Sequence, residues 1–287
     1  MTSLPSTAVD ALLGDAAGAL VVRRQGGIVT LQLHRPDRHN AISYAMWSAL
    51  SRILPALADD DSVDVLVLRG SPGGPFSSGA DISEFSSLRA GAEGARNYSA
   101  TVAAGEAALI AFPRPTIAMI EGFAIGGGTQ LAVACDLRVA DETSRFGVTP
   151  ARLGIVYPPS STARLVETVG AAWARWLLLT AELLDATQAL RIGLVHEVHP
   201  RGEVEQRVQA LADTIAGRAR ISLTGAKQLL AAQDKPATDQ QFEELQALSW
   251  SSPEYAEGVE AFLAKRPPAF RAARDGQDGS PRTGALT

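Results

Sequence analysis

Short, uninterrupted apolar runs alternate with longer amphipathic stretches over the first two thirds of the chain. Such runs are typical of strands buried inside a sheet. They cover residues 21–24, 28–33, 63–68, 116–120, 137–140 and 194–198. The first two runs, separated by Gly26 and Gly27, predict a hairpin. The stretch from Ser43 to Leu57 predicts a helix with Ser43 as its N-cap, and another helix is expected at 92–112. Repeated strand-then-helix units indicate an α/β core.

The remainder of the chain has a purely helical pattern. Helices are expected at 204–217, 222–233, 239–251 and 254–265. We therefore divide the chain into four parts. They are a loosely held N-terminal arm at 1–18, an α/β core at 19–200, a helical C-terminal module at 201–271 and a disordered tail, rich in Gly, Ser, Pro and Asp, at 272–287.

Composition narrows the class of protein. Hydrophobic residues make up 46% and charged residues 20% of the 287 residues, as in soluble globular proteins. The net charge of −5 disfavours a nucleic-acid partner. No apolar run reaches the roughly 18–20 residues that span a bilayer, and no basic residue precedes Arg23 as a signal peptide would require. We therefore expect a cytoplasmic protein that binds neither nucleic acid nor membrane.

Metal and disulfide chemistry are not expected. Cys135 is the single cysteine, which excludes an internal disulfide framework and a multi-cysteine metal site. The four histidines, none of them in a metal-ligand spacing, are His34, His39, His196 and His199. The candidate chemistry therefore has to come from other groups.

Two glycine-rich turns, at 76–82 and 122–130, each lie between an apolar run and an expected helix start. Backbone N–H groups at a helix N-terminus lack partners within the helix and sit at the positive end of its dipole. Glycine lets a ligand approach them closely. Two such turns brought together would form an oxyanion site from main-chain donors. The alternative is that these glycines only permit tight turns and close packing. Neither a dinucleotide fingerprint, a P-loop nor a GxSxG elbow is present.

The order and spacing of several motifs, from about residue 20 to 270, resemble the crotonase (enoyl-CoA hydratase/isomerase) superfamily. The motifs are 34–41 (HRPDRHNA), 76–82 (FSSGADI), 126–130 (GGGTQ), 134–137 (ACDL), 189–195 (ALRIGLV) and 262–267 (FLAKRP). The resemblance implies a spiral of ββα units, a helical C-terminal trimerisation module, and a trimer or dimer of trimers. It also implies an acyl-CoA substrate, with coenzyme A as part of the substrate and no separate cofactor.

Positions of the superfamily's site carry over residue by residue. The thioester oxygen would lie between the backbone N–H groups of Ala80 and Gly127, each worth roughly 3–4 kcal/mol of transition-state stabilisation. The resemblance also places a group of residues around the nucleotide part of coenzyme A: Arg38, His39, Ala41, Asp81 and Ile82. Phe262 and Lys265 match C-terminal positions that reach coenzyme A, often from a neighbouring subunit. The alternative for Arg38 and His39 is an ordinary solvated loop.

The sequence departs from the superfamily's hydratases at both acid/base positions. Hydratases use two glutamates, one to activate water and one to deliver a proton. The positions that match them hold Gln130 and Pro150. Neither side chain titrates, so a conventional hydratase or one-glutamate isomerase is poorly supported. Glu84, Glu106 and Glu121 are the nearest carboxylates in the sequence, and we do not expect any of them to act as a replacement acid.

The segment 146–157 resembles methylmalonyl-CoA decarboxylase, in which a Thr-Pro pair is followed by a tyrosine; Thr149 and Tyr157 occupy those positions. Decarboxylation of a malonyl thioester needs no base, since loss of CO₂ generates the enolate. Hydroxyl and amide groups of Thr149, Tyr157 and Gln130 would hold a carboxylate without repulsion. The match is partial, because the decarboxylase has a histidine at the position that corresponds to Ala80 and a glutamate at the position that corresponds to Gln130. Tyr157 as a plain aromatic wall and Thr149 as a turn residue are the alternatives.

Three hypotheses follow. The first is a lyase that decarboxylates a malonyl- or alkylmalonyl-CoA through an enolate. The second is an enoyl-CoA hydratase or isomerase whose acid/base groups come from non-standard positions, and the third is a non-catalytic acyl-CoA-binding protein. The acyl chain that fits depends on how residues 85–98 fold.

Overall fold

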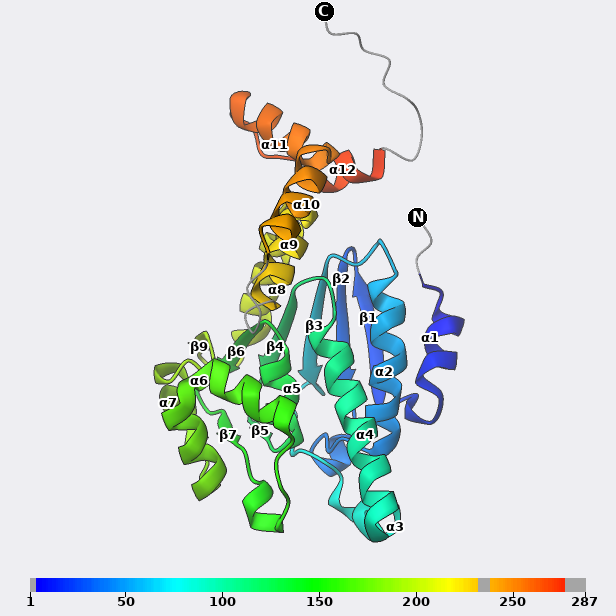
Figure 1. Cartoon of the computed structure of the whole chain (residues 1–287), viewed down its shortest axis with the longest axis vertical. Helices are drawn as coiled ribbons and strands as arrows, with labels where there is room; N and C mark the ends of the chain where they lie inside the picture. The colour runs from blue at the N-terminus through cyan, green and yellow to red at the C-terminus, as the bar shows by residue number, and fades with distance from the viewer. Residues whose placement is uncertain (1–3, 232–237, 277–287) are drawn as a thin grey trace, which may run out of the picture.

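The computed structural model describes residues 4–231 and 238–276, and its centre is a six-stranded sheet. The strands lie in the order β1-β2-β3-β4-β6-β9 (Figure 1). Their bounds are β1 Leu20–Gln25, β2 Ile28–Leu33, β3 Val65–Gly70, β4 Thr116–Ile120, β6 Leu137–Asp141 and β9 Glu197–His199. β1 and β2 pair antiparallel, which confirms the predicted hairpin, and the remaining neighbours are parallel.

A second, three-stranded sheet carries one of the glycine-rich turns. Its strands are β5 Phe123–Ile125, β7 Arg145–Gly147 and β8 Leu184–Asp185, in the order β5-β7-β8. The sequence analysis placed β5 inside the glycine-rich turn 122–130 and predicted no strand at β7, so both strands were missed. Each strand has only three residues or fewer, too short to show the period of two by which a strand is recognised.

Helices cover both faces of the large sheet, which explains its continuous apolar strands. One face packs against α2 Tyr44–Ala58, α4 Gly91–Ile110 and α5 Gly127–Ala134 (Figure 1). Helix α2 confirms the predicted helix, and the Ser43 side chain accepts a hydrogen bond from Met46 N as its N-cap. The other face packs against α8 Val204–Ala216, whose buried residues contact alternate positions of the same strands.

The remaining helices of the core surround these layers. They are the long helix α6 Pro159–Thr180, the shorter helices α1 Ser6–Leu13, α3 Phe85–Leu88 and α7 Ala186–Arg191, and the single turns η1 Gly14–Ala16, η2 Pro36–Arg38, η3 Ile82–Glu84 and η4 Pro150–Leu153. None of the helices in the described ranges is long and apolar enough to cross a membrane.

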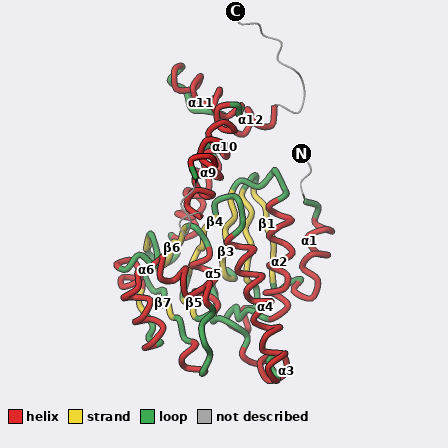
Figure 2. Tube along the Cα trace, viewed as in Figure 1, coloured by secondary structure: helices red, strands yellow, loops and turns green. Residues whose placement is uncertain are grey.

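Four helices extend from one end of the sheet and form what we call the C-terminal arm: α9 Arg220–Ala231, α10 Asp239–Trp250, α11 Pro253–Leu263 and α12 Phe270–Asp275. Figure 2 shows that the described part of the arm consists of helices joined by turns. Asp64, just before β3, binds the arm through Arg220, Arg271 and Arg274 at 2.6–3.0 Å. The first helix of the predicted C-terminal module (201–271) is α8. Because α8 packs on the sheet, it belongs to the core rather than to the C-terminal arm.

Both chain ends differ from the predictions in the described part. Residues 1–18 were expected to be a loosely held arm, but α1 packs on α2 and buries Val9 and Leu13. An Ala- and Leu-containing segment has high helix propensity, and its apolar side chains find a partner only in the folded protein. Residues 272–287 were expected to be disordered, yet α12 continues to Asp275 because Arg274 pairs with Asp64 and Glu254. The rest of that predicted tail, 277–287, lies outside the described residues.

Candidate active site

The two glycine-rich turns lie side by side. Ser77 N donates to the Phe123 carbonyl and Ile125 N donates to the Ser77 carbonyl, both at 3.0 Å. Ser77 thereby pairs with Ala124 as in a short parallel ladder. These bonds join segments almost fifty residues apart in the sequence and bring residues 79–80 against residues 126–127.

Glycine is required where the turns touch. Gly79 has a φ of 101°, and a Cβ atom there would lie 2.7 Å from Ile125 O. Gly126 has a φ of 53° and precedes the first residue of α5. Side chains at these two positions would be strained or would push the turns apart. The glycines therefore set how closely the two turns approach.

Ala80 and Gly127 lie close together and line the same pocket. A Cβ atom on Gly127 would lie 3.4 Å from Ala80 N. Neither amide has a hydrogen-bond acceptor among the described residues. Gly127 opens α5, so its N–H also lies at the positive end of the helix dipole. The geometry is suited to holding one negatively charged oxygen.

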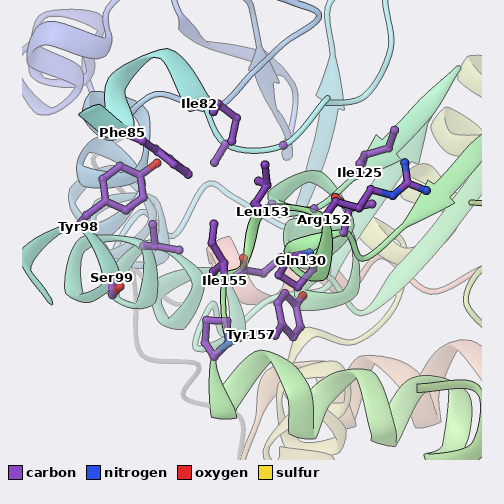
Figure 3. Close-up of a pocket in the computed structure, with 18 of the residues that line it drawn as sticks. Ile82, Phe85, Tyr98, Ser99, Ile125, Gln130, Arg152, Leu153, Ile155 and Tyr157 are labelled. Carbon is purple, nitrogen blue, oxygen red and sulfur yellow. The ribbon is translucent and has the colours of Figure 1, made fainter. Parts of the chain in front are cut away.

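A pocket of about 340 Å³ opens beside these amides (Figure 3). Ala80, Gly127, Gln130, Thr149 and Tyr157, the five residues predicted as catalytic, all line it. Other walls are mainly apolar: Trp47, Ile82, Phe85, Tyr98, Val102, Ile125, Leu153, Ile155 and Val156. None of the lining residues is an aspartate or a glutamate. The pocket thus joins main-chain donors to hydroxyl and amide side chains.

Gln130 is held from behind the pocket by a buried carboxylate. Its Nε2 donates to Glu106 Oε2 at 3.0 Å, and Ser161 Oγ donates to the same oxygen at 2.8 Å. Glu106 comes from α4 and is 2% exposed. Glu106 was one of three nearby carboxylates for which the sequence predicted no role as a replacement acid. Its contact with Gln130 could not be predicted, because α4 and α5 meet only in the folded protein.

Tyr157 and Thr149 present hydroxyl groups to the pocket. Burial raises the pKa of Tyr157 above its usual range, and the nearby charge of Glu106 adds to this effect while Ser161 opposes it. Tyr157 therefore remains a neutral O–H donor, and it lies next to Gln130 in Figure 3. Thr149 Oγ1 has no hydrogen-bond partner in the described part of the chain and lies on the Gly126 side of the pocket.

Comparisons with known proteins identify the family. The sequence model described as enoyl-CoA hydratase/isomerase matches residues 23–273. A 2,3-dehydroadipyl-CoA hydratase from Escherichia coli is 35% identical, over 88% of this chain and 98% of that protein. A putative enoyl-CoA hydratase from Thermus thermophilus is 36% identical, over 88% of this chain and all of that protein. The chain belongs to the enoyl-CoA hydratase/isomerase family.

Solved structures of this crotonase superfamily have the same fold. An enoyl-CoA hydratase/carnithine racemase from Magnetospirillum magneticum superposes with a TM-score of 0.85 at 34% identity, over 88% of this chain and 95% of that one. An enoyl-CoA hydratase/isomerase family protein from Hyphomonas neptunium gives 0.85 at 32% identity, over 88% and 97%. The predicted crotonase fold, with its helical C-terminal region, is therefore confirmed.

The loop that matches the superfamily's nucleotide-binding region packs against the first glycine-rich turn. Ser78 N donates to the His39 carbonyl at 3.0 Å, and the exposed Arg38 and His39 side chains border this turn. Ala41 is buried, and its carbonyl accepts from Arg35. These contacts place the loop near the pocket entrance.

Two of the predicted coenzyme A residues lie at the end of the first turn. Asp81 is buried and pairs with Arg35 at 2.8 Å. Burial alone would raise the pKa of Asp81, but hydrogen bonds from Ser83 and Arg35 hold it below its usual range. Asp81 is thus committed to protein partners. Ile82 is 48% exposed and lines the pocket.

Phe262 and Lys265 are not near the pocket within one chain. Phe262 belongs to α11 and Lys265 follows this helix, and neither lines the pocket. Figure 1 shows α11 at the far end of the C-terminal arm, opposite α3. Phe262 is 83% exposed. A role for them at coenzyme A therefore requires the arm of a second subunit.

Phe85, Arg89 and Tyr98, three residues of the segment 85–98, form a wall of the pocket. This segment folds into α3 and the start of α4, and the rings of Phe85 and Tyr98 meet edge to face with centroids 5.4 Å apart. Arg89 lies 4.6 Å above the Phe85 ring. Trp47 on α2 closes the pocket near Gly127. The sequence predicted that this segment controls the acyl chain but did not identify the wall residues.

Proposed function

We propose that this protein is an acyl-CoA lyase that decarboxylates a malonyl- or alkylmalonyl-CoA through an enolate held by Ala80 N and Gly127 N. One observation carries the proposal. The pocket beside these amides contains hydroxyl and amide side chains, and none of the described residues that line it is an aspartate or a glutamate. A site without a base in contact with substrate suits a reaction in which the leaving CO₂ generates the enolate.

The reaction has two steps. The bond between the α-carbon and the carboxylate carbon breaks, CO₂ leaves, and the electron pair forms the thioester enolate, whose oxygen accepts hydrogen bonds from Ala80 and Gly127. Each such donor contributes roughly 3–4 kcal/mol to the transition state. A neutral donor then gives a proton to the α-carbon, so each turnover consumes one proton and releases one CO₂.

The pocket walls favour loss of the carboxylate. Ile125, Leu153 and Ile155 surround the space with apolar surface, which stabilises neutral CO₂ better than a carboxylate. Thr149 and Tyr157 supply hydroxyl donors that hold the carboxylate in place without ionising. The carboxylate can then be turned out of the thioester plane, the orientation in which its bond to the α-carbon overlaps the carbonyl.

Hydration of an enoyl-CoA is the second candidate, because the similar proteins from Escherichia coli and Thermus thermophilus are named as hydratases. The contact that supports it is the 3.0 Å hydrogen bond between Gln130 and Glu106, which puts one carboxylate behind a side chain that can hold water. Water would have to be activated through Gln130, since Glu106 does not line the pocket.

The deciding experiment incubates the purified protein separately with methylmalonyl-CoA and crotonyl-CoA and follows both by mass spectrometry. Conversion of methylmalonyl-CoA to propionyl-CoA with CO₂ release supports the lyase. Addition of water to crotonyl-CoA without CO₂ release from the malonyl thioester would reject it in favour of the hydratase. Binding of both thioesters without turnover would identify a non-catalytic acyl-CoA-binding protein.

We also propose that the protein self-associates through the C-terminal arm, as a trimer or dimer of trimers, and that coenzyme A contacts Phe262 and Lys265 of a neighbouring subunit. The arm exposes large apolar side chains in support of this: Leu230, Leu248, Trp250, Phe262 and Leu263 are 58–83% exposed. Such a concentration of apolar surface is typical of an interaction site.

A further inference from the structure

Glu106 is a buried carboxylate without a cationic partner. It is 2% exposed, and no Lys, Arg or His of the described residues lies within ion-pair distance of it. Burying a carboxylate without a counter-charge is costly unless hydrogen bonds replace water. Glu106 Oε2 accepts them from Gln130 Nε2 at 3.0 Å and Ser161 Oγ at 2.8 Å.

This contact fixes which way the Gln130 amide faces. A carboxylate oxygen only accepts hydrogen bonds, so the nitrogen of Gln130 must be the atom directed at Glu106. The carbonyl oxygen, Oε1, is then directed away from Glu106. Because Gln130 lines the pocket, its amide meets the substrate as a hydrogen-bond acceptor of fixed orientation.

An acceptor at this point is useful for protonating the enolate. A water molecule that donates one hydrogen to Gln130 Oε1 has its second hydrogen free for the α-carbon. The enolate electron pair takes that proton, and the hydroxide left behind is neutralised by a proton from solvent. An amide oxygen cannot remove a proton from this water, so the water remains a neutral acid.

We propose that Glu106 is a positioning residue that holds Gln130 with Oε1 toward the pocket, so that Gln130 binds the water that protonates the enolate. The inference rests on the proposed function and deepens it by naming the proton donor. It makes the charge of Glu106, rather than its volume, the property that matters, because a neutral amide at position 106 could pair with Gln130 in either orientation.

The test compares the wild type with Glu106→Gln, which keeps the shape and removes the charge, and with the control Glu93→Gln, the same change at an exposed position of the same helix. Methylmalonyl-CoA is turned over in D₂O, and both kinetics and the configuration of the deuterated α-carbon of propionyl-CoA are measured. Loss of a positioned group costs about 10- to 100-fold in rate. We expect Glu106→Gln to lower kcat by that factor, to leave KM within about twofold, and to give a mixture of configurations, whereas Glu93→Gln behaves as the wild type.

The inference is overturned if Glu106→Gln has the wild-type kcat and gives a single configuration. It is also overturned if the variant loses both kcat and thermal stability but still gives a single configuration. If Glu106→Gln fails to fold, Gln130→Met replaces it, since that variant removes the amide and is expected to show the same loss of kcat and stereospecificity. An unaltered Gln130→Met overturns the inference as well.

The two proposals fail separately. If the wild type hydrates crotonyl-CoA and releases no CO₂, the lyase is rejected but a water at Gln130 is still required. The inference then requires Glu106→Gln to lower the hydration rate. A wild type that decarboxylates while Glu106→Gln is unaffected rejects only the role of Glu106. A wild type without either activity rejects both.

Discussion

Gly79 lies so close to the carbonyl oxygen of Ile125 that a Cβ atom would stand 2.7 Å from it. This approach joins the two glycine-rich turns and places the Ala80 and Gly127 amides at one pocket. Gly79 also has a φ of 101°, which side chains adopt only with strain. Its lack of a side chain is therefore a condition for the candidate site.

Replacement of Gly79 by alanine is expected to separate the two amides. We expect kcat to fall by about 100-fold or more, the effect of removing one oxyanion donor, and stability to fall by about 2 kcal/mol. Gly73→Ala is the control, since Gly73 has a φ of 75° but nothing within 4 Å of the added atom. Steady-state kinetics and thermal unfolding check both. Equal kinetic losses in the two variants would show that strain, not the contact with Ile125, is responsible.

The hydroxyl groups of Thr149 and Tyr157 are expected to hold the carboxylate that leaves. Thr149→Val and Tyr157→Phe should each lower kcat/KM for methylmalonyl-CoA by about 10- to 100-fold, the worth of a hydrogen bond to a charged group. Tyr44→Phe is the control, because its hydroxyl bonds Thr101 outside the pocket. Unchanged decarboxylation in both pocket variants would leave these residues as ordinary wall and turn residues.

Asp60 is expected to make the free energy of unfolding depend on pH under acidic conditions. Burial alone would raise its pKa, but hydrogen bonds from Leu4, Ser62 and Arg24 outweigh it and lower the pKa from 3.8 to about 2. The folded state therefore binds this proton less readily than the unfolded chain. The ionised Asp60 therefore contributes about 2 kcal/mol to the free energy of unfolding. This contribution is fully present above pH 3.8 and is lost as the pH falls through about 2.

Asp60→Asn tests this by chemical unfolding at several pH values. The variant should be less stable at neutral pH, and the difference from the wild type should shrink as the pH falls below 3.8. Asp59→Asn, an exposed neighbour, serves as the control. A difference that stays constant down to pH 2 would contradict the assignment. Because one bond to Asp60 comes from Leu4, the same data report how firmly the N-terminal segment is held.

Self-association is expected to complete the coenzyme A site. Light scattering should give a mass of three or six chains of 30.1 kDa each. Lys265→Ala should raise KM for acyl-CoA thioesters about tenfold through loss of a charged contact, with kcat and the assembly mass unchanged. A monomeric mass combined with normal KM in Lys265→Ala would remove both Phe262 and Lys265 from the site.

Much of the architecture was predictable because it depends on local patterns. The hairpin at β1 and β2, the apolar strands β3, β4 and β6, and the Ser43 cap of α2 follow from periodicity and capping. The short strands β5 and β7 did not, because three residues carry too little periodicity. The arm expected at 1–18 was wrong for α1 because its apolar face becomes useful only against α2.

The candidate site also has features that the sequence determines and features that depend on the tertiary structure. By itself the sequence determined the family, the two glycine-rich turns, and the absence of a carboxylate at positions 130 and 150, since these are properties of residue type and spacing. Tertiary structure alone decided that the turns meet, that Phe85 and Tyr98 wall the pocket, and that Glu106 holds Gln130. The reason is physical: a hydrogen bond between α4 and α5 depends on how two helices pack on one sheet, and no local pattern in either helix specifies its partner across that distance.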